Sequence, residues 1–201
     1  MVLSGRLLRD LRARVGVAGV VYGGCHGLEI LGRGIAFVHP RAHSSLGAIT
    51  SARMALQRGA RGVPGALVED KRLGVSLHYR HVARGRRGDA FALVARVARE
   101  HPDLRLISGK KVLEFVPRLR WDKGRAARWI VARVAPTLPR AARPPLVLFA
   151  GDDAPDEAAF AALRAGGITV RVGGRRGGAA YRVGSVGGLR ALLGQALRRL
   201  D

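Results

Sequence analysis

The sequence predicts an α/β fold built around a parallel sheet, and three observations support this prediction. First, Leu146–Ala150 ("LVLFA") is a short, fully apolar run, typical of a strand that is buried on both faces of a parallel sheet. Second, an acidic loop, a helical stretch and the β-rich run Ile168–Gly173 ("ITVRVG") follow it, which is the order of a parallel strand–helix–strand unit. Third, the middle of the chain alternates between helical and strand periods.

The first segment contains parts of two strands and a helix. Val2–Arg6 ("VLSGR") has the pattern of a strand that ends in a Ser-Gly turn, Leu7–Gly16 is a helical stretch, and Gly19–Gly27 is a β-rich run ending in glycines. If Met1–Leu3 end a strand, the chain begins in the middle of a core element, whereas a central parallel strand needs its full length to be paired and buried. We therefore expect the first strand of the core to be missing from this chain.

The middle segment, from about Leu28 to Val116, shows both periods. Two stretches have helical spacing, Ser44–Gly59 and Gly88–Pro102. Two others alternate as strands do, Leu73–Val82 and Lys110–Val116. The serine at the start of the first helix can cap it. In the second helix, Phe91, Val94 and Val97 fall on one face, which we expect to pack against the strands.

The last segment returns to alternating strands and helices. Besides the strands Leu146–Ala150 and Ile168–Gly173, it contains three helical stretches, Trp121–Val134, Asp156–Gly167 and about Gly187–Leu200. A Pro-rich linker, Ala135–Pro145, follows the first of these helices.

The length and composition fit one large domain or two small ones, because 201 residues with 48% apolar content can bury a real core. No apolar run is long enough to span a membrane, and the N-terminal stretch lacks the apolar region of a secretory signal. The single cysteine, Cys25, excludes an internal disulfide. We expect a soluble, cytoplasmic protein without a membrane partner, and a monomer.

The net charge of +22 suggests a polyanionic partner, but the basic residues do not form a defined patch in the sequence. They are almost all arginines and are scattered along every segment, without a basic tail, zinc-finger spacing or aromatic-rich strand. We therefore expect weak attraction to polyanions and no specific nucleic-acid partner.

Four of the 14 carboxylates fall within six residues, at Asp152, Asp153, Asp156 and Glu157. Such clustering is costly unless a positive charge lies between the carboxylates. A helix N-terminus accounts for Asp156 and Glu157 but not for the preceding pair. Because the pair directly follows an apolar strand, where ligands bind in open parallel sheets, we favour a Mg²⁺ site formed by Asp152, Asp153 and Asp156.

Two further places could contact an anion. Ser4-Gly5-Arg6, in a strand-to-helix turn, could present a hydroxyl and backbone N–H groups, although an ordinary helix cap explains an isolated tripeptide of this kind better. Lys123, at the start of a helix, could stabilise a phosphate beside a metal, and a solvated lysine is the alternative.

The order of these elements resembles motifs two, three and four of the haloacid-dehalogenase-like phosphatases. The residues within the motifs resemble one family among them, trehalose-6-phosphate phosphatase. Five stretches carry the resemblance, and they span nearly the whole chain: "SGRLLRDLRARVGVAGVVYGGCHGLEI", "VEDKRLGVSLHYR", "GKKVLEFVP", "WDKGRAARWIV" and "GDDAPDEAAFAAL". The resemblance implies a Rossmann-like parallel-sheet core in two parts, residues 1–27 and 117–201, and an inserted α/β cap, residues 28–116.

The resemblance also implies the hydrolysis of trehalose 6-phosphate in trehalose biosynthesis, through an aspartyl-phosphate and with Mg²⁺. It assigns Ser4 to a phosphoryl oxygen and Lys123 to the charge of the phosphate. The metal would be held by Asp152 and Asp153, with Asp156 as ligand or support. The residues implied to bind or border the substrate are Arg6, His26, Glu69, Lys71 and Glu114. Without the resemblance, Glu69 and Lys71 could simply be the charged edge of a strand.

This sequence departs from the family pattern in three ways. Pro155 and Cys25 replace residues that are usually Thr and a small polar residue, and neither change removes an assigned group. No DxDGT motif, which supplies the nucleophile and the general acid/base, occurs in the 201 residues. We therefore expect the chain as given to be truncated and inactive. The alternatives are a phosphatase for another sugar phosphate, or a non-catalytic sugar-phosphate-binding or regulatory module.

Overall fold

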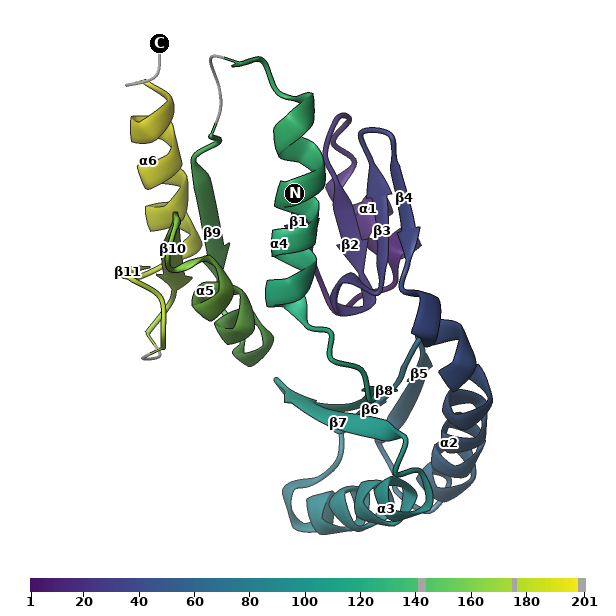
Figure 1. Ribbon diagram of the computed structural model, residues 1–201. Helices are drawn as coiled ribbons and strands as arrows, with labels where there is room; N and C mark the ends of the chain where they lie inside the picture. The colour runs from purple at the N-terminus through teal and green to yellow at the C-terminus, as the bar shows by residue number, and fades with distance from the viewer. Residues whose placement is uncertain (141–143, 175–176, 199–201) are drawn as a thin grey trace. The chain divides into compact units, whose positions relative to one another are not determined.

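The computed structural model describes residues 1–140, 144–174 and 177–198, and the chain divides into two compact units, Met1–Arg120 and Trp121–Asp201 (Figure 1). Both units combine strands with helices, which confirms the predicted α/β class. Parts of the predicted linker at 135–145 and of the final helix lie outside the described residues.

The first sheet of the first unit has the order β1-β2-β3-β4. Its strands, with the helix that connects the first two, are β1 (Val2–Leu3), α1 (Leu8–Val15), β2 (Tyr22–Gly24), β3 (Glu29–Gly32) and β4 (Ile35–Val38). β1 and β2 are parallel, as the intervening helix requires, and β3 and β4 form an antiparallel hairpin. This hairpin was not predicted from the sequence; its two turn residues, Arg33 and Gly34, both have positive φ angles. Arginine is rare at such a position, so the usual Asn-Gly or Asp-Gly signal is absent.

The second sheet of this unit is antiparallel and has the order β5-β6-β8-β7. It consists of β5 (Leu67–Asp70), β6 (Val75–His78), β7 (Leu104–Gly109) and β8 (Val112–Pro117), and it packs against α2 (Leu46–Ala60) and α3 (Arg87–Glu100). Both helices lie on the same side of the sheet (Figure 1), and the core between them includes the fully buried Leu56, Val97 and Phe115.

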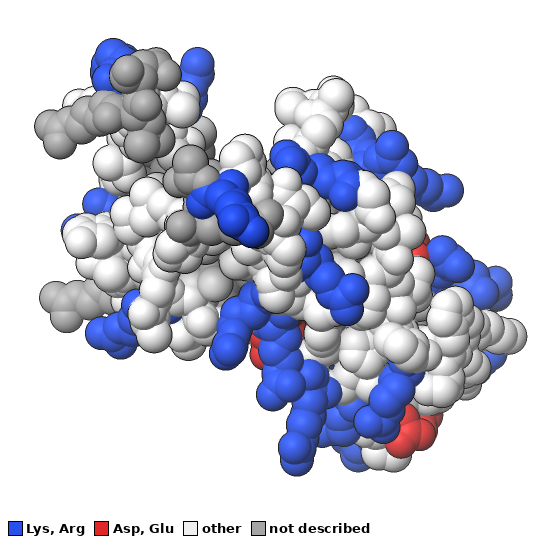
Figure 2. All heavy atoms as spheres, turned by 45° about the horizontal axis from the view of Figure 1, so that its top comes forward, with Lys and Arg blue, Asp and Glu red and all other residues white. Residues whose placement is uncertain are grey.

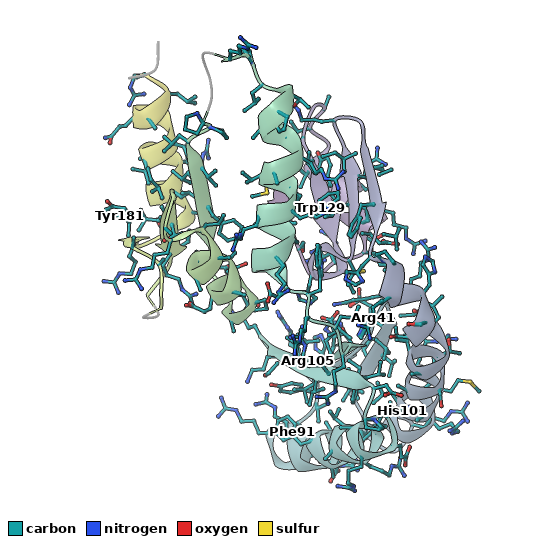
Figure 3. The ribbon with its side chains drawn as sticks, viewed as in Figure 1. Arg41, Phe91, His101, Arg105, Trp129 and Tyr181 are labelled. Atoms are coloured by element: carbon teal, nitrogen blue, oxygen red, sulfur yellow. The ribbon has the colours of Figure 1, made fainter. Side chains whose placement is uncertain are left out.

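The two predicted helices of this region are confirmed, with two local differences. A 3₁₀ turn, η2 (Pro40–Ser45), precedes α2, and the serine at the helix start makes no side-chain cap. In α3, Val94 and Val97 are buried as expected, but Phe91 is 45% exposed. Its ring makes an edge contact with Tyr79, at 5.2 Å between centroids, on the rim of the core (Figure 3).

In its described residues, the second unit contains three parallel strands in the order β11-β10-β9. These strands are β9 (Val147–Gly151), β10 (Gly167–Val172) and β11 (Tyr181–Val183), and the helices are α4 (Lys123–Val134), α5 (Glu157–Leu163) and α6 (Val186–Leu197). The parallel pairing of β9 with β10 confirms the prediction made from their apolar sequences. α4 and α5 lie close together because Gly124 has no side chain: a Cβ there would collide with the carbonyl of Ala158.

The surface reflects the high net charge. On the face shown in Figure 2, Lys and Arg side chains are distributed over the surface, and Asp and Glu appear only in small patches. Within the described ranges, no helix combines the length and the apolar character needed to cross a bilayer.

Candidate functional site

The carboxylate of Asp156 is turned into the second unit rather than out to solvent. Its Oδ1 accepts a hydrogen bond from Lys123 Nζ at 2.6 Å, and its Oδ2 accepts from the backbone N–H groups of Asp152 and Asp153, at 3.0 Å each. The side chains of Lys123 and Asp156 are only 9% and 7% exposed. A Cβ on Gly151 would lie 2.5 Å from Asp156 Cγ, so the end of β9 needs glycine to admit this carboxylate.

A second internal cation, Arg171 on β10, holds the end of the acidic loop. Its Nη1 lies 2.7 Å from Glu157 Oε1 and 3.3 Å from the carbonyl oxygen of Asp153, and Glu157 also accepts a hydrogen bond from the N–H of Gly178. The Arg171 side chain is only 6% exposed. Sequence reasoning missed this residue, although an arginine in the middle of an apolar strand is a signal, since a buried charge needs a partner.

Lys123 and Arg171 therefore account for part of the carboxylate clustering. Asp153 Oδ1 accepts from the N–H of Ala154 and caps the 3₁₀ turn η6 (Ala154–Asp156), where Pro155 occupies the first turn and loses no needed N–H. The Asp152 side chain is exposed, and within the described ranges no hydrogen bond to its carboxylate is found.

The loop has a partial set of donors for Mg²⁺. Among the described residues, no group of three His, Cys, Asp or Glu side chains is placed to hold a metal ion. Mg²⁺ usually takes one or two protein carboxylates and completes its shell with phosphate and water. Asp152, exposed just after β9, fits this requirement, whereas the Asp153 carboxylate already accepts from the backbone N–H groups of Ala154 and, in a capping box, of Asp156. Both oxygens of Asp156 already accept hydrogen bonds from protein donors.

Ser4 lies directly after β1, and its hydroxyl is used within its own turn. Its Oγ accepts from the N–H of Arg6 at 3.2 Å, so it does not cap α1, whose N-cap position is Leu7. The side chain of Arg6 is exposed. Gly5 leaves room for the ring of His26, because a Cβ at Gly5 would lie 2.7 Å from His26 Cε1.

Three of the five predicted substrate-binding residues meet in a buried cluster in the first unit. Glu114 Oε2, on β8, lies 2.9 Å from Lys71 Nζ and 3.4 Å from His26 Nε2. The side chains of Lys71 and Glu114 are 8% and 7% exposed. Glu69 pairs instead with His78, at 2.7 Å between Oε2 and Nε2, but it shares the face of the sheet with Glu114, because Glu69, Ser76 and Glu114 are paired across β5, β6 and β8.

The surroundings of this cluster shift two pKa values. Burial alone would raise the pKa of Glu114, but the hydrogen bond from His26 and the positive charges of His26 and Lys71 outweigh it and lower the pKa. Burial, together with the charges of Glu29 and Glu114, raises the pKa of the Cys25 thiol to about 12. Cys25 is therefore a protonated thiol at neutral pH and not a nucleophile.

The lowered pKa of Glu114 predicts that the first unit loses stability in acid. A carboxyl group whose pKa is lower in the folded than in the unfolded state stabilises the fold fully above its ordinary value of 4.5, and this contribution disappears as the pH falls through the lowered pKa. We expect the wild-type chain to lose more unfolding free energy than Glu114→Gln between about pH 6 and about pH 3. Urea denaturation followed by far-UV circular dichroism measures this difference, and equal losses in the two proteins would contradict the prediction.

Residues 1–179 match the model of a protein family described as trehalose-phosphatase. A relative from Mycobacterium marinum, named trehalose-phosphate phosphatase, is 38% identical over 173 residues, which are 85% of this chain and 43% of the relative. The chain thus spans less than half the length of this relative.

Solved structures show the same fold. One, described as a trehalose-6-phosphate phosphatase related protein, superposes with a TM-score of 0.77 at 22% identity and covers 96% of this chain and 77% of that chain. Another, the C-terminal domain of the Candida albicans trehalose-6-phosphate phosphatase, gives a TM-score of 0.78 at 20% identity and covers 96% and 76%. At these identities the two structures bear on the fold alone.

Proposed function

The chain belongs to the trehalose-phosphatase family, and from this premise we propose that it carries the sugar-binding and part of the phosphate-binding apparatus of a trehalose 6-phosphate phosphatase. The observation that carries the proposal is the buried cluster of His26, Lys71 and Glu114. A carboxylate, an ammonium and an imidazole held together offer both donors and acceptors to sugar hydroxyl groups. We propose that these residues and Glu69 bind the sugar, with Arg6 at the border of the site. Glu69, Lys71 and Glu114 belong to a cap of about residues 28–116, and His26 lies just before it.

For the phosphate, the chain offers Ser4 after β1, and Lys123 and the acidic loop in the second unit. We propose that the Ser4 hydroxyl donates to a phosphoryl oxygen and that Lys123, oriented by Asp156, stabilises the negative charge of the phosphate. Asp152 and Asp153 are the residues that would hold Mg²⁺, and Asp156 supports them through their backbone N–H groups. When bound, Mg²⁺ would neutralise part of the phosphoryl charge.

The chemical step needs carboxylates that this sequence does not contain. Attack on the phosphate by an aspartate, and proton transfer by a second one, require a DxDGT motif, and none occurs in the 201 residues. We therefore propose that this chain by itself binds the sugar phosphate without hydrolysing it. The same observation favours the second candidate function, a non-catalytic module that binds a sugar phosphate. We propose that the partner of the chain is a small molecule, that the chain has no specific nucleic-acid partner and that it acts as a monomer.

Calorimetric titration with trehalose 6-phosphate, together with an assay of phosphate release in the presence of Mg²⁺, tests the proposal. We expect the 201-residue chain to bind trehalose 6-phosphate more tightly than sucrose 6-phosphate or glucose 6-phosphate, and to release no phosphate from any of them. Phosphate release is also measured for the same chain extended by the codons that precede it in frame, and the two proteins are compared. Turnover in the extended protein alone supports the enzyme, and binding without turnover in both supports the non-catalytic module. The absence of binding to all three sugar phosphates would refute both candidates.

A further inference from the structure

The turn between β5 and β6 carries Lys71, and the next residue, Arg72, attaches this turn to the sheet formed by β1 to β4. Arg72 Nη1 lies 2.8 Å from Glu29 Oε1 on β3. Glu29 is one of the few buried carboxylates, with its side chain 8% exposed, whereas the Arg72 side chain is 62% exposed. In the part of the chain that the structure describes, Arg72 is the side chain that pairs with Glu29.

The backbone of this turn sends consecutive side chains to different partners. Arg72 has a φ angle of 60°, and its N–H donates to Asp70 Oδ1 at 2.8 Å. The N–H of Lys71 donates to the carbonyl oxygen of Gly74 at 2.9 Å. As a result, the Lys71 ammonium meets Glu114 while the next residue, Arg72, meets Glu29. A non-glycine residue in the left-handed region is strained, so other contacts must hold the turn in this form.

Packing does not hold the Arg72 side of the turn. Arg72 faces an open hollow of about 570 Å³, whose lining residues are Leu7, Leu8, Arg9, Arg12, Glu29, Asp70 and Arg72. An arginine side chain beside such a space has many conformations available, and the buried carboxylate of Glu29 selects one of them. The backbone of Lys71 is a further fixed point, besides the hydrogen bonds within the turn, because its carbonyl oxygen accepts a hydrogen bond from the Cys25 thiol at 3.4 Å.

We propose that Glu29 and Arg72 are positioning residues for sugar recognition: their ion pair fixes the β5–β6 turn so that the Lys71 ammonium is held beside Glu114 and His26. This inference rests on the proposed function for the role of Lys71, but the positioning itself concerns this chain's own geometry. Neither residue contacts the cluster directly through its side chain, so each acts through the turn.

Acetylation of lysines, read by mass spectrometry, tests the positioning without any ligand. The chain has only four lysines, of which Lys71 and Lys123 are buried and Lys110 and Lys111 are exposed. We expect Glu29→Gln and Arg72→Met to increase the acetylation rate of Lys71 by about tenfold, since local opening then costs less. Lys123, in the other unit, should keep its protection. Arg72→Lys keeps the charge and is compared in the titration with trehalose 6-phosphate, where it should retain most of the affinity; in the acetylation assay the reagent would neutralise the new exposed lysine.

Arg12→Met is the matched control, since it removes a positive charge from the same hollow without touching the turn. We expect it to leave Lys71 protected. The same variants are then titrated with trehalose 6-phosphate, where Glu29→Gln and Arg72→Met should each bind about tenfold more weakly. The double variant should be no weaker than either single one, because both changes break the same contact.

The outcomes separate this inference from the proposed function. Lys71 that stays protected in both Glu29→Gln and Arg72→Met, or that loses protection equally in Arg12→Met, would overturn the inference. Selective loss of Lys71 protection supports it, even if the wild-type chain fails to bind trehalose 6-phosphate, which would refute the proposed function alone. Loss of protection at Lys71 and Lys123 together would indicate general destabilisation and would also overturn the inference.

Discussion

Replacing Lys123 by Met is expected to lower the unfolding free energy of the second unit by about 3–5 kcal/mol, because it leaves the buried carboxylate of Asp156 without its cation. Lys123 Nζ and Asp156 Oδ1 are 2.6 Å apart, and both side chains are less than one tenth exposed. Met fills nearly the same space as the lysine stem, so the loss reports the missing charge rather than a cavity. The backbone N–H groups of Asp152 and Asp153 remain as donors to Asp156, but they do not neutralise it.

The two tryptophans of the chain make this measurement specific to the second unit. Trp121 and Trp129 both belong to it, and Trp129 lies on α4, which begins with Lys123 (Figure 3). Urea denaturation followed by tryptophan fluorescence therefore reports the unit that contains the ion pair. Lys110→Met, at an exposed lysine of the first unit, is the control and should change the midpoint little. A Lys123→Met protein within about 1 kcal/mol of wild type would show that Asp156 is satisfied by its backbone donors alone.

Replacing Glu114 by Leu is expected to destabilise the first unit by a similar amount, about 3–5 kcal/mol, because Lys71 would keep a buried charge without its partner. Lys71→Met should lower the unfolding free energy by a comparable amount, because Glu114 would then keep a buried charge without its cation. In the double variant Lys71→Met/Glu114→Leu neither charge remains, so we expect it to be more stable than either single variant. Urea denaturation followed by far-UV circular dichroism gives the four free energies of this cycle.

The same four proteins distinguish structural from functional roles of the pair. If the charges of Lys71 and Glu114 recognise the sugar, the double variant should regain stability but not affinity for trehalose 6-phosphate. Affinity that returns together with stability would mean that the pair serves the fold and does not contact the sugar. Additive losses in the double variant would show that the 2.9 Å contact carries no coupling energy.

The longer elements were predictable from the sequence because their patterns repeat over several turns or lie in fully apolar runs. α2, α3 and α4 have helical spacing over 12 to 15 residues, and β9 is a continuous apolar run. The missed strands are β4, β7 and β11, each at the edge of its sheet, together with β3, whereas the stretch of β5 was offered only as the possible edge of a strand. The edge strands β4, β7 and β11 are only partly buried, so their hydrophobic pattern is weak. The predicted domain boundaries stay a prediction; β3 and β4, which follow residue 28, share a sheet with β1 and β2.

By itself, the sequence determined the residue types of the candidate site and their order: Ser4, Lys71, Glu114, Lys123 and the acidic loop stand in the motifs of the trehalose-phosphatase family. It did not determine which charge meets which. Only the tertiary structure decided that Asp156 belongs to Lys123, that Glu157 belongs to Arg171 and that Glu114 lies between Lys71 and His26. These partners are 14 to 88 residues apart, so they meet only when strands and helices pack. Burial then fixes the pairing, because a charge removed from water is tolerated only beside its partner.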